Sequence, residues 1–233
     1  MRFNYIFGIF FFLFLSCKKE DKVDKIPNET STMQDVEGNV YATVKIGNQW
    51  WMAENLKVKK FSDGSLINEI AISVNDSVWE NTSEGAFCSI DSRYGLLYNW
   101  NAVSDTKKIA PDGWHIPTDE EWKTLEKTLG MSDNETNGLA WRGSNVGLLL
   151  MKTSIEWMNP IEIYTSKEGF NAIPSGCRVF NGNVNNENNT AFFWTSSENN
   201  NQAWYRYLDS QNKGVYRQFT HKNYGFSIRC IKD

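Results

Sequence analysis

The sequence predicts an α+β domain in which antiparallel β-sheets and hairpins pack against one or two helices. An alternating apolar and polar run that turns back at residue 47 predicts a hairpin, and a capped segment from residue 118 predicts a helix. A third observation is a series of short β runs between residues 192 and 231. The 233 residues are ample for one domain with a sizeable core.

The first 16 residues have the pattern of a secretory signal peptide. Arg2 precedes an apolar run, Tyr5–Leu15, which is shorter than the about 20 residues that a membrane-spanning helix needs. The Leu-Ser-Cys step that ends at Cys17 resembles the lipobox of bacterial lipoproteins, in which the signal is cut before an acylated cysteine. We therefore expect a signal peptide at 1–16, lipidation of Cys17, and an exported lipoprotein at the outer membrane or cell surface. An ordinary secretory peptide with an incidental cysteine is the alternative.

Residues 18–34 carry charges, one proline, Ser and Thr, but almost no large apolar side chains. Such a composition cannot bury enough surface to offset the entropy lost on ordering. We expect a flexible tether here and a single globular domain at 35–233. The net charge of -4, with both signs interspersed, argues against a nucleic-acid partner.

Residues 40–52 predict a β-hairpin. Apolar and polar side chains alternate in residues 40–46, which places one face of the strand toward the core. Gly47-Asn48 then offers a two-residue turn, and residues 49–52 return. The side chains expected to point inward are Val40, Ala42, Val44 and Ile46.

The segment that begins at Thr118 predicts a helix. Thr118 can cap the first free N–H groups, and Glu121, three residues on, can close a capping box. An apolar series at helical spacing follows, and Gly130 stands where a helix commonly ends. We interpret the acidic residues 119–121 as a helix start that complements the helix dipole, not as a catalytic acid–base group.

Short β runs, rich in aromatic and β-branched residues, predict a sheet toward the C-terminus. Turns of Asn, Gly, Ser and Lys separate them. In the last run, Phe226, Ile228 and Cys230 share one face, and Ser227 and Arg229 share the other. The runs are 192–197, 203–208, 214–219 and 225–231.

Three cysteines remain beyond the expected lipidation site, namely Cys88, Cys177 and Cys230. Disulfides persist in an exported compartment, so the odd count leaves open one pair with a free thiol or no pair at all. We expect these thiols to be buried and inert. The chain has no Cys-x-x-Cys pattern and only two histidines, His115 and His221, so we predict neither a metal site nor a cofactor.

Eight motifs follow one another in residues 35–233, at 44–47, 51–56, 94–100, 113–118, 169–174, 193–198, 205–208 and 225–230. In this order they resemble the Fibrobacter succinogenes major paralogous domain. The resemblance implies a C-type-lectin-like fold, related to the domain of formylglycine-generating enzymes, on secreted or surface proteins. At Ala110 the family often has a cysteine, so Cys230 is expected to lack its usual partner, and whether Cys88 or Cys177 replaces it is open.

This chain lacks the residues on which the known activities of the C-type-lectin-like fold depend. Calcium-dependent lectins of the fold place acidic residues in a Glu-Pro-Asn or Gln-Pro-Asp step and in a Trp-Asn-Asp step. In this chain Met158 precedes Asn159-Pro160, and Asn99-Trp100-Asn101 has no acid. The paired active-site cysteines of formylglycine-generating enzymes have no match near Cys230. We therefore predict no catalytic residues.

Amide-rich loops beside aromatic residues predict a binding surface. Residues 181–189 and 199–202 are rich in asparagine. Carboxamides donate to and accept from hydroxyl groups, while aromatic faces pack against sugar rings. The alternative is that these rings pack the core and the asparagines form solvated turns. The predicted ligand-binding residues are Trp194, Asn199, Asn200, Trp204, Tyr205 and Tyr207.

These observations predict an envelope- or surface-anchored lipoprotein that acts as a non-catalytic adhesion or glycan-binding module. The expected partners are the membrane, through the N-terminal lipid, a polysaccharide or glycan, and other envelope proteins. Two alternatives stay open: an enzyme that processes envelope glycans, and a structural or assembly partner of other envelope proteins.

Overall fold

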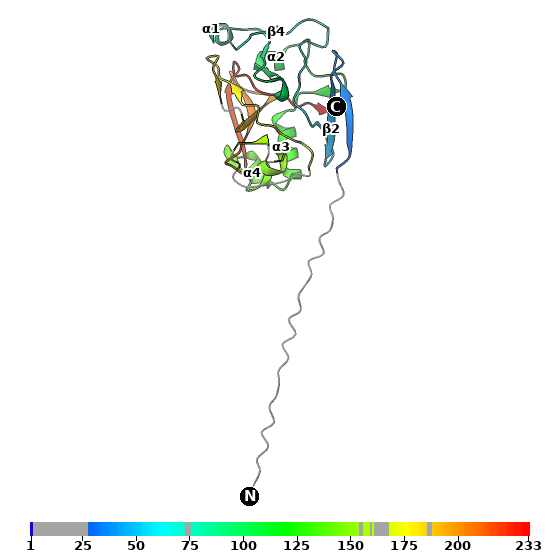
Figure 1. The fold of residues 1–233 in the computed structure, drawn as a ribbon, viewed down its shortest axis with the longest axis vertical. Coiled ribbons are helices and arrows are strands. Elements are labelled where there is room, and N and C mark those ends of the chain that lie inside the picture. Colours follow the sequence, from blue (N-terminus) through cyan, green and yellow to red (C-terminus); the bar gives the residue numbers. More distant parts are fainter. Residues whose placement is uncertain (2–27, 73–75, 154–155, 159, 161–167, 186–187) are drawn as a thin grey trace.

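The structure, a computed structural model, describes Met1 and residues 28–233 apart from short internal segments (Figure 1). Residues 2–16 of the predicted signal peptide, Cys17 and residues 18–27 of the predicted tether lie outside the described residues. Among the described residues, no helix is long and apolar enough to cross a membrane. The segments outside the description are 2–27, 73–75, 154–155, 159, 161–167 and 186–187.

The described chain is mostly β-sheet with a few short helices, so the α+β class is confirmed. Helices α1 and α2 lie with strand β4 at one end of the folded body, and α3 and α4 lie at the other end (Figure 1). The helices are α1 Asp76–Glu80, the 3-10 helix Ser92–Tyr94, α2 Trp100–Ser104, α3 Asp119–Thr128, α4 Asp133–Asn137 and α5 Val146–Leu150.

A five-stranded antiparallel sheet brings the two ends of the described fold together, with the C-terminus beside the N-terminal strands (Figure 1). Ile231 pairs with Trp51 on one side and with His115 on the other. The last strand therefore closes the sheet that the first strands begin. The strands, in sheet order, are β1 Thr30–Gln34, β2 Val40–Ile46, β3 Gln49–Met52, β14 Ile231–Lys232 and β7 Trp114–His115.

The predicted flexible tether, residues 18–34, extends too far toward the C-terminus. Residues 30–34 form β1, which pairs with β2 from Thr30 opposite Val44 to Gln34 opposite Val40. Only Met33 in this strand is buried. An edge strand that is held by backbone hydrogen bonds and exposes polar side chains leaves no hydrophobic pattern in the sequence, which explains the error.

The predicted hairpin at residues 40–52 is confirmed, with Ile46 opposite Gln49 and Gly47 at φ +61°. The predicted inward face is only half right. Val44 and Ile46 are buried, whereas Val40 and Ala42 are exposed, and Tyr41 and Thr43 are buried in their place. The buried face changes along β2 because the strand contacts two core clusters. Tyr41 belongs to one cluster, and Val44 belongs to the other.

A four-stranded antiparallel sheet, in the order β11-β12-β13-β8, confirms the first three of the predicted C-terminal β runs. The fourth run, 225–231, enters a strand only at Ile231. The run lies between two sheets, because isolated β-bridges join Phe226 to Tyr98 and Ser227 to Phe193. Both of its faces are therefore buried. The strands are β11 Thr190–Asn199, β12 Gln202–Asp209, β13 Val215–His221 and β8 Ala140–Arg142.

Two smaller sheets complete the described architecture. One has the order β4-β5-β6, in which β4 and β5 are parallel, and the other pairs β9 with β10. Their strands are β4 Asn68–Glu69, β5 Ala86–Cys88, β6 Leu97–Tyr98, β9 Cys177–Arg178 and β10 Val184–Asn185.

Strand β11 separates two large core clusters because its successive side chains point to opposite faces. Phe193 enters the α3 core, a cluster that also holds Trp51, Trp122 and Phe170. Trp194 enters the α2 core, a cluster that also holds Trp100 and Phe226. The four-stranded sheet thus has α3 on one face, and its other face carries the candidate site.

Helix α3 begins and ends where the sequence predicts. Thr118 accepts a hydrogen bond from the backbone N–H of Glu121, and the Glu121 carboxylate accepts from the Thr118 N–H at 2.7 Å. Leu129 caps the C-terminus, and Gly130 follows at φ +105°. His115 bonds Glu121 through Nε2 at 2.8 Å, so this histidine contacts the first turn of α3.

Candidate functional site

Aromatic side chains cross all four strands on the face of the sheet that points away from α3. Residues paired directly across antiparallel strands point to the same face. The register pairs Trp141 with Tyr216, Tyr216 with Tyr207, and Tyr207 with Phe192. The Trp141 ring lies 5.0 Å from Tyr207 and 5.2 Å from Tyr216, and Phe192 stacks on Tyr207 at 4.5 Å with 9° between the planes.

The ring contacts continue beyond the edge of the sheet. Phe192 stacks on the buried Phe226 at 5.0 Å, Phe226 contacts Tyr224 at 5.5 Å, and Tyr224 contacts Phe180 at 5.7 Å. The ends of the series are the most open, since Trp141 is 36% exposed and Phe180 is 40% exposed. We call this series the aromatic row: Trp141, Tyr216, Tyr207, Phe192, Phe226, Tyr224 and Phe180.

An open pocket of about 450 Å³ lies at the Phe180 end of the aromatic row. Amide side chains line much of it, and the His221 ring lies 5.7 Å from Phe180. We call it the amide pocket. Its lining includes Glu80, Asn81, Phe180, Asn201, His221 and Asn223.

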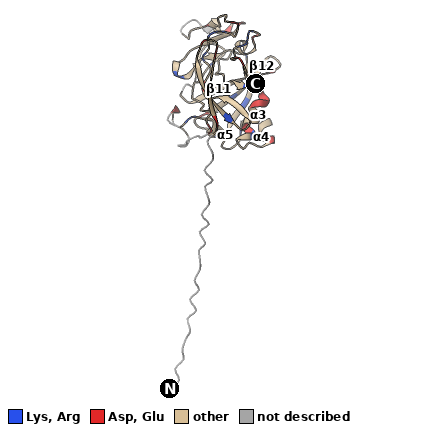
Figure 2. Cartoon of the chain, turned by 90° about the vertical axis from the view of Figure 1, so that its right-hand side faces the viewer, with Lys and Arg blue, Asp and Glu red and all other residues tan. Residues whose placement is uncertain are grey.

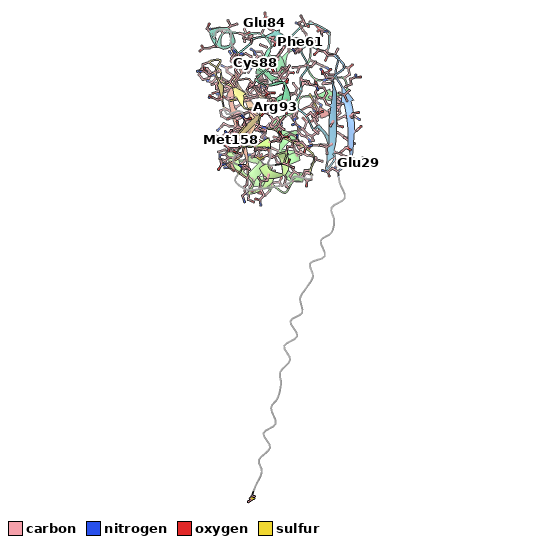
Figure 3. The ribbon with its side chains drawn as sticks, viewed as in Figure 1. Glu29, Phe61, Glu84, Cys88, Arg93 and Met158 are labelled. Atoms are coloured by element: carbon pink, nitrogen blue, oxygen red, sulfur yellow. The ribbon has the colours of Figure 1, made fainter. Side chains whose placement is uncertain are left out.

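The pocket of largest volume among those described lies elsewhere, between α2 and strands β4 and β5, and holds about 840 Å³. Figure 3 shows two of its lining residues, Glu84 and Phe61, at this end of the body. Its two aromatic rings are covered by lysines, because Lys107 lies 5.2 Å over Phe61 and Lys59 lies 5.8 Å over Phe87. The end rings of the aromatic row are more open than these two rings, since Trp141 is 36% and Phe180 is 40% exposed, whereas Phe61 and Phe87 are buried.

Residues 44–232 match the family model of the Fibrobacter succinogenes major domain. The chain belongs to this family. The match begins in β2 and ends in β14, so it includes the four-stranded sheet and the whole aromatic row. No curated protein and no solved structure matches the chain.

The two predicted ligand-binding tryptophans of this Fibrobacter succinogenes major domain are not part of the open surface of the aromatic row, since Trp194 is buried beneath the row and Trp204 lies on the other face of the sheet. Trp194 is 0% exposed, and its indole N–H donates to the Tyr98 carbonyl at 2.8 Å, so its prediction as a contact residue is wrong. Trp204 lies on the opposite face, because neighbouring residues of a strand alternate. Its half-buried ring covers the Arg217 guanidinium at 3.8 Å, so Trp204 does not belong to the aromatic row, and its role in ligand binding stays a prediction.

The predicted tyrosines and asparagines of the domain lie at or near the aromatic row. Tyr207 belongs to it, and Tyr205 is half-buried beside it, 6.2 Å from Phe192. Asn199 pairs with Gln202 at the end of the β11–β12 hairpin. Asn200 is an exposed turn residue at φ +56°, directly before Asn201, which lines the amide pocket.

Sequence reasoning missed most of the aromatic row of the domain. Tyr216 carried a signal, because it alternates with Val215 and Arg217 in a predicted strand. Trp141 carried none, since its place beside Tyr216 depends on a pairing across distant segments. Phe180 and Tyr224 lie outside regular strands and reach the row only through tertiary packing.

The hydroxyl groups of the two row-side tyrosines are held neutral. Burial raises the pKa of Tyr205 well above 10. Burial and a hydrogen bond to Asp209 raise the pKa of Tyr207 in the same direction. Both phenols therefore present neutral O–H groups and uncharged rings at neutral pH.

The described part of the domain shows neither a paired cysteine nor a cluster of possible metal ligands. Cys88, Cys177 and Cys230 are buried and unpaired. Burial raises the pKa of Cys88 to about 11 and that of Cys177 to about 12, so both remain protonated thiols at neutral pH. No group of three or more His, Cys, Asp or Glu side chains that could hold a metal ion occurs among the described residues.

Proposed function

We propose that this domain is a non-catalytic adhesion module that binds a polysaccharide or glycan along the aromatic row. The observation that carries the proposal is the continuous line of ring contacts from Trp141 to Phe180, open at both ends. Aromatic faces in a line can pack against successive sugar rings. The amide pocket at the end of the line supplies donors and acceptors for hydroxyl groups.

We also propose that the protein is an exported lipoprotein, anchored to the outer membrane or cell surface through Cys17. The apolar run Tyr5–Leu15 and the Leu-Ser-Cys step support this anchor. The lipid would place the aromatic row outside the cytoplasm, where polysaccharides are met. The proposed fold is C-type-lectin-like, which the pairing of the last strand β14 with β3 of the N-terminal hairpin supports.

A polysaccharide pull-down and a glycan array test the proposal. The probe is the chain from Asn28 onward, which contains all of the described strands and helices. Trp141→Ala should lower affinity for a retained glycan about two- to tenfold, because one aromatic contact contributes about 0.5–1.5 kcal/mol. The matched control is Trp50→Ala, which removes a half-buried tryptophan from the other large sheet.

Three outcomes would contradict the proposal. The first is that no glycan is retained, and the second is that Trp141→Ala and Trp50→Ala change affinity equally. The third is release of sugar fragments that stops when a carboxylate is changed without loss of fold, which would make the protein an enzyme. Co-purification of an envelope protein without any glycan would instead favour the assembly role.

A further inference from the structure

A pocket of about 320 Å³ next to the N-terminal hairpin is lined by several cationic side chains and one carboxylate. The single acidic residue of its lining is Glu54, whose Oε2 accepts the backbone N–H of Ala42 at 2.8 Å. We call it the cationic pocket. Its cationic residues are Lys57, Arg93, Lys152 and Arg229.

Arg229 is buried in the cationic pocket and has only neutral hydrogen-bond partners among the described residues. Its Nε donates to the Asn55 amide oxygen at 2.6 Å, and its two terminal nitrogens donate to the carbonyls of Met52, Phe170 and Asn171. Burial lowers its pKa to about 9, so the guanidinium stays charged at neutral pH. The charge of Glu54 acts on Arg229 without a hydrogen bond between them, so burial of this cation is only partly compensated, and a bound anion would offset the remaining cost.

Asn55 connects Arg229 to the loop that contains Arg93 through two hydrogen bonds. Its amide nitrogen donates to the Tyr94 carbonyl at 2.9 Å, while its amide oxygen receives Arg229. The loop approaches closely because Gly95 has φ +79°, and a Cβ there would lie 2.9 Å from the Asn55 Cβ. The wall of the cationic pocket is therefore fixed by packing and does not depend on a bound ligand.

The rim of the cationic pocket offers cations that a ligand can recruit. The exposed Lys57 ammonium lies 5.3 Å over the Tyr41 ring and has no carboxylate within salt-bridge distance in the described part of the chain. Arg93, labelled in Figure 3, pairs with Asp91, and Lys152 pairs with Glu156. Exposed ion pairs of this kind contribute little, so either cation can turn toward an anion at small cost.

We propose that the cationic pocket binds an anionic oxygen group, a carboxylate, sulfate or phosphate, on a ligand about as large as one sugar residue. Arginine and lysine are the side chains that recognise such groups through charge-assisted hydrogen bonds. Lys57 supplies the exposed charge that meets the ligand, and Arg229 supplies the fixed positive field beneath it. The site does not use the aromatic row and stands independently of the proposed glycan surface.

Calorimetric or NMR titrations of the chain from Asn28 onward test the site. The probes are galacturonate, inorganic sulfate and inorganic phosphate, with galactose as the neutral comparison. We expect saturable binding of at least one oxyanion, weaker at higher salt, and none of galactose. The probe that binds most tightly identifies the source as a uronate, a sulfate or a phosphate.

Variants of Lys57 give the decisive comparison. Lys57→Glu should weaken oxyanion binding at least about tenfold, since it replaces an attraction by a repulsion. Lys232→Glu makes the same charge change at an exposed residue of strand β14 and should leave binding unchanged. Equal effects of the two variants, or no saturable oxyanion binding, would overturn the proposal. Trp141→Ala should leave oxyanion binding intact. The proposal for this site and the proposal for the aromatic row are therefore tested separately.

Discussion

The Asp119 carboxylate, at the first residue of α3, accepts two hydrogen bonds from the Arg217 guanidinium of β13. Arg217 Nε donates to Oδ1 at 2.9 Å, and Nη2 donates to Oδ2 at 2.6 Å. Both side chains are less than a tenth exposed. Arg206 from β12 bonds the same carboxylate at 2.8 Å and also bonds Glu126, about two turns further along the same face of α3, at 2.6 Å. Buried charges of alternating sign therefore fasten α3 to the sheet, on the side where Figure 2 shows the acidic residues of α3 and α4.

Removing the Asp119 charge should destabilise the domain strongly. Asp119→Asn leaves the buried Arg217 without a carboxylate partner and leaves Arg206 with Glu126 alone, and the expected loss is about 3–5 kcal/mol in the free energy of unfolding. Urea unfolding at pH 7 measures it. The matched control is Glu120→Gln, whose side chain is 78% exposed and whose ion pair with Lys123 contributes below about 1 kcal/mol.

The same pair predicts how the difference depends on pH. Burial raises the pKa of Asp119, but the hydrogen bond from Arg217 and the charge of Arg206 lower it more, so it lies well below 3.8. A depressed carboxyl pKa contributes stability that is present above 3.8 and lost as pH falls through the folded value. The gap between Asp119→Asn and the unchanged protein should narrow in acid, and a gap that stayed constant would contradict this origin.

His115 should make stability depend on pH in the opposite direction. Burial lowers its pKa, but hydrogen bonds to Asp233 at 2.6 Å and Glu121 at 2.8 Å raise it more, so it lies above 6.5. A raised histidine pKa contributes stability that is fully present below 6.5 and lost as pH rises through the folded value. His115→Gln should flatten the dependence of the urea midpoint on pH above 6.5, whereas His221→Gln, at the amide pocket, should preserve it.

Local signals account for the parts of the fold that the sequence predicts. The β2–β3 hairpin follows from alternation and from the Gly47 turn, and α3 follows from the capping box of Thr118 and Glu121. Each signal lies within a few neighbouring residues. The absence of a disulfide among the described cysteines could not be predicted, because pairing depends on which thiols the fold brings together.

The candidate site was harder to predict because it depends on strand register and on which face each strand buries. Trp194, Trp204 and Tyr205 look alike as aromatic residues of predicted strands. The fold buries the first, turns the second toward Arg217 and leaves the third beside the aromatic row. Arg206 and Arg217 would each pass for solvent-facing residues, and only the position of α3 makes them core residues.

Gly147 lets α5 touch the loop before β13. Its N–H donates to the Lys213 carbonyl at 2.8 Å, and a Cβ there would lie 2.1 Å from the Gly214 carbonyl oxygen. Gly147→Ala should therefore cost about 3 kcal/mol or prevent folding, because backbone must move. Gly64→Ala tests the alternative cause: with φ +84° and no atom within 4 Å of a Cβ, it should cost only about 1–2 kcal/mol. Thermal unfolding of both variants measures the contrast.

The three described cysteines should be inert toward thiol reagents in the folded chain. Cys88 and Cys230 are 0% exposed and Cys177 is 4% exposed, and burial raises the pKa of each. The chain from Asn28 onward should therefore react with a disulfide reagent only after denaturation and then show all three thiols. Fast labelling before denaturation, or a missing pair of thiols afterwards, would contradict the prediction.

Tyr207 separates the contribution of its ring from that of its hydroxyl group. Tyr207→Phe removes the hydrogen bond to Asp209 and should cost about 1 kcal/mol of stability, but it keeps the ring between Trp141 and Phe192. Tyr207→Ala removes the ring and interrupts the aromatic row. Retention on a polysaccharide column should therefore survive Tyr207→Phe and fall with Tyr207→Ala, with urea unfolding as the check on stability. If Tyr207→Phe lost retention as fully as Tyr207→Ala, the ligand would be reading the hydroxyl group, and stacking along the row would not be its main attachment.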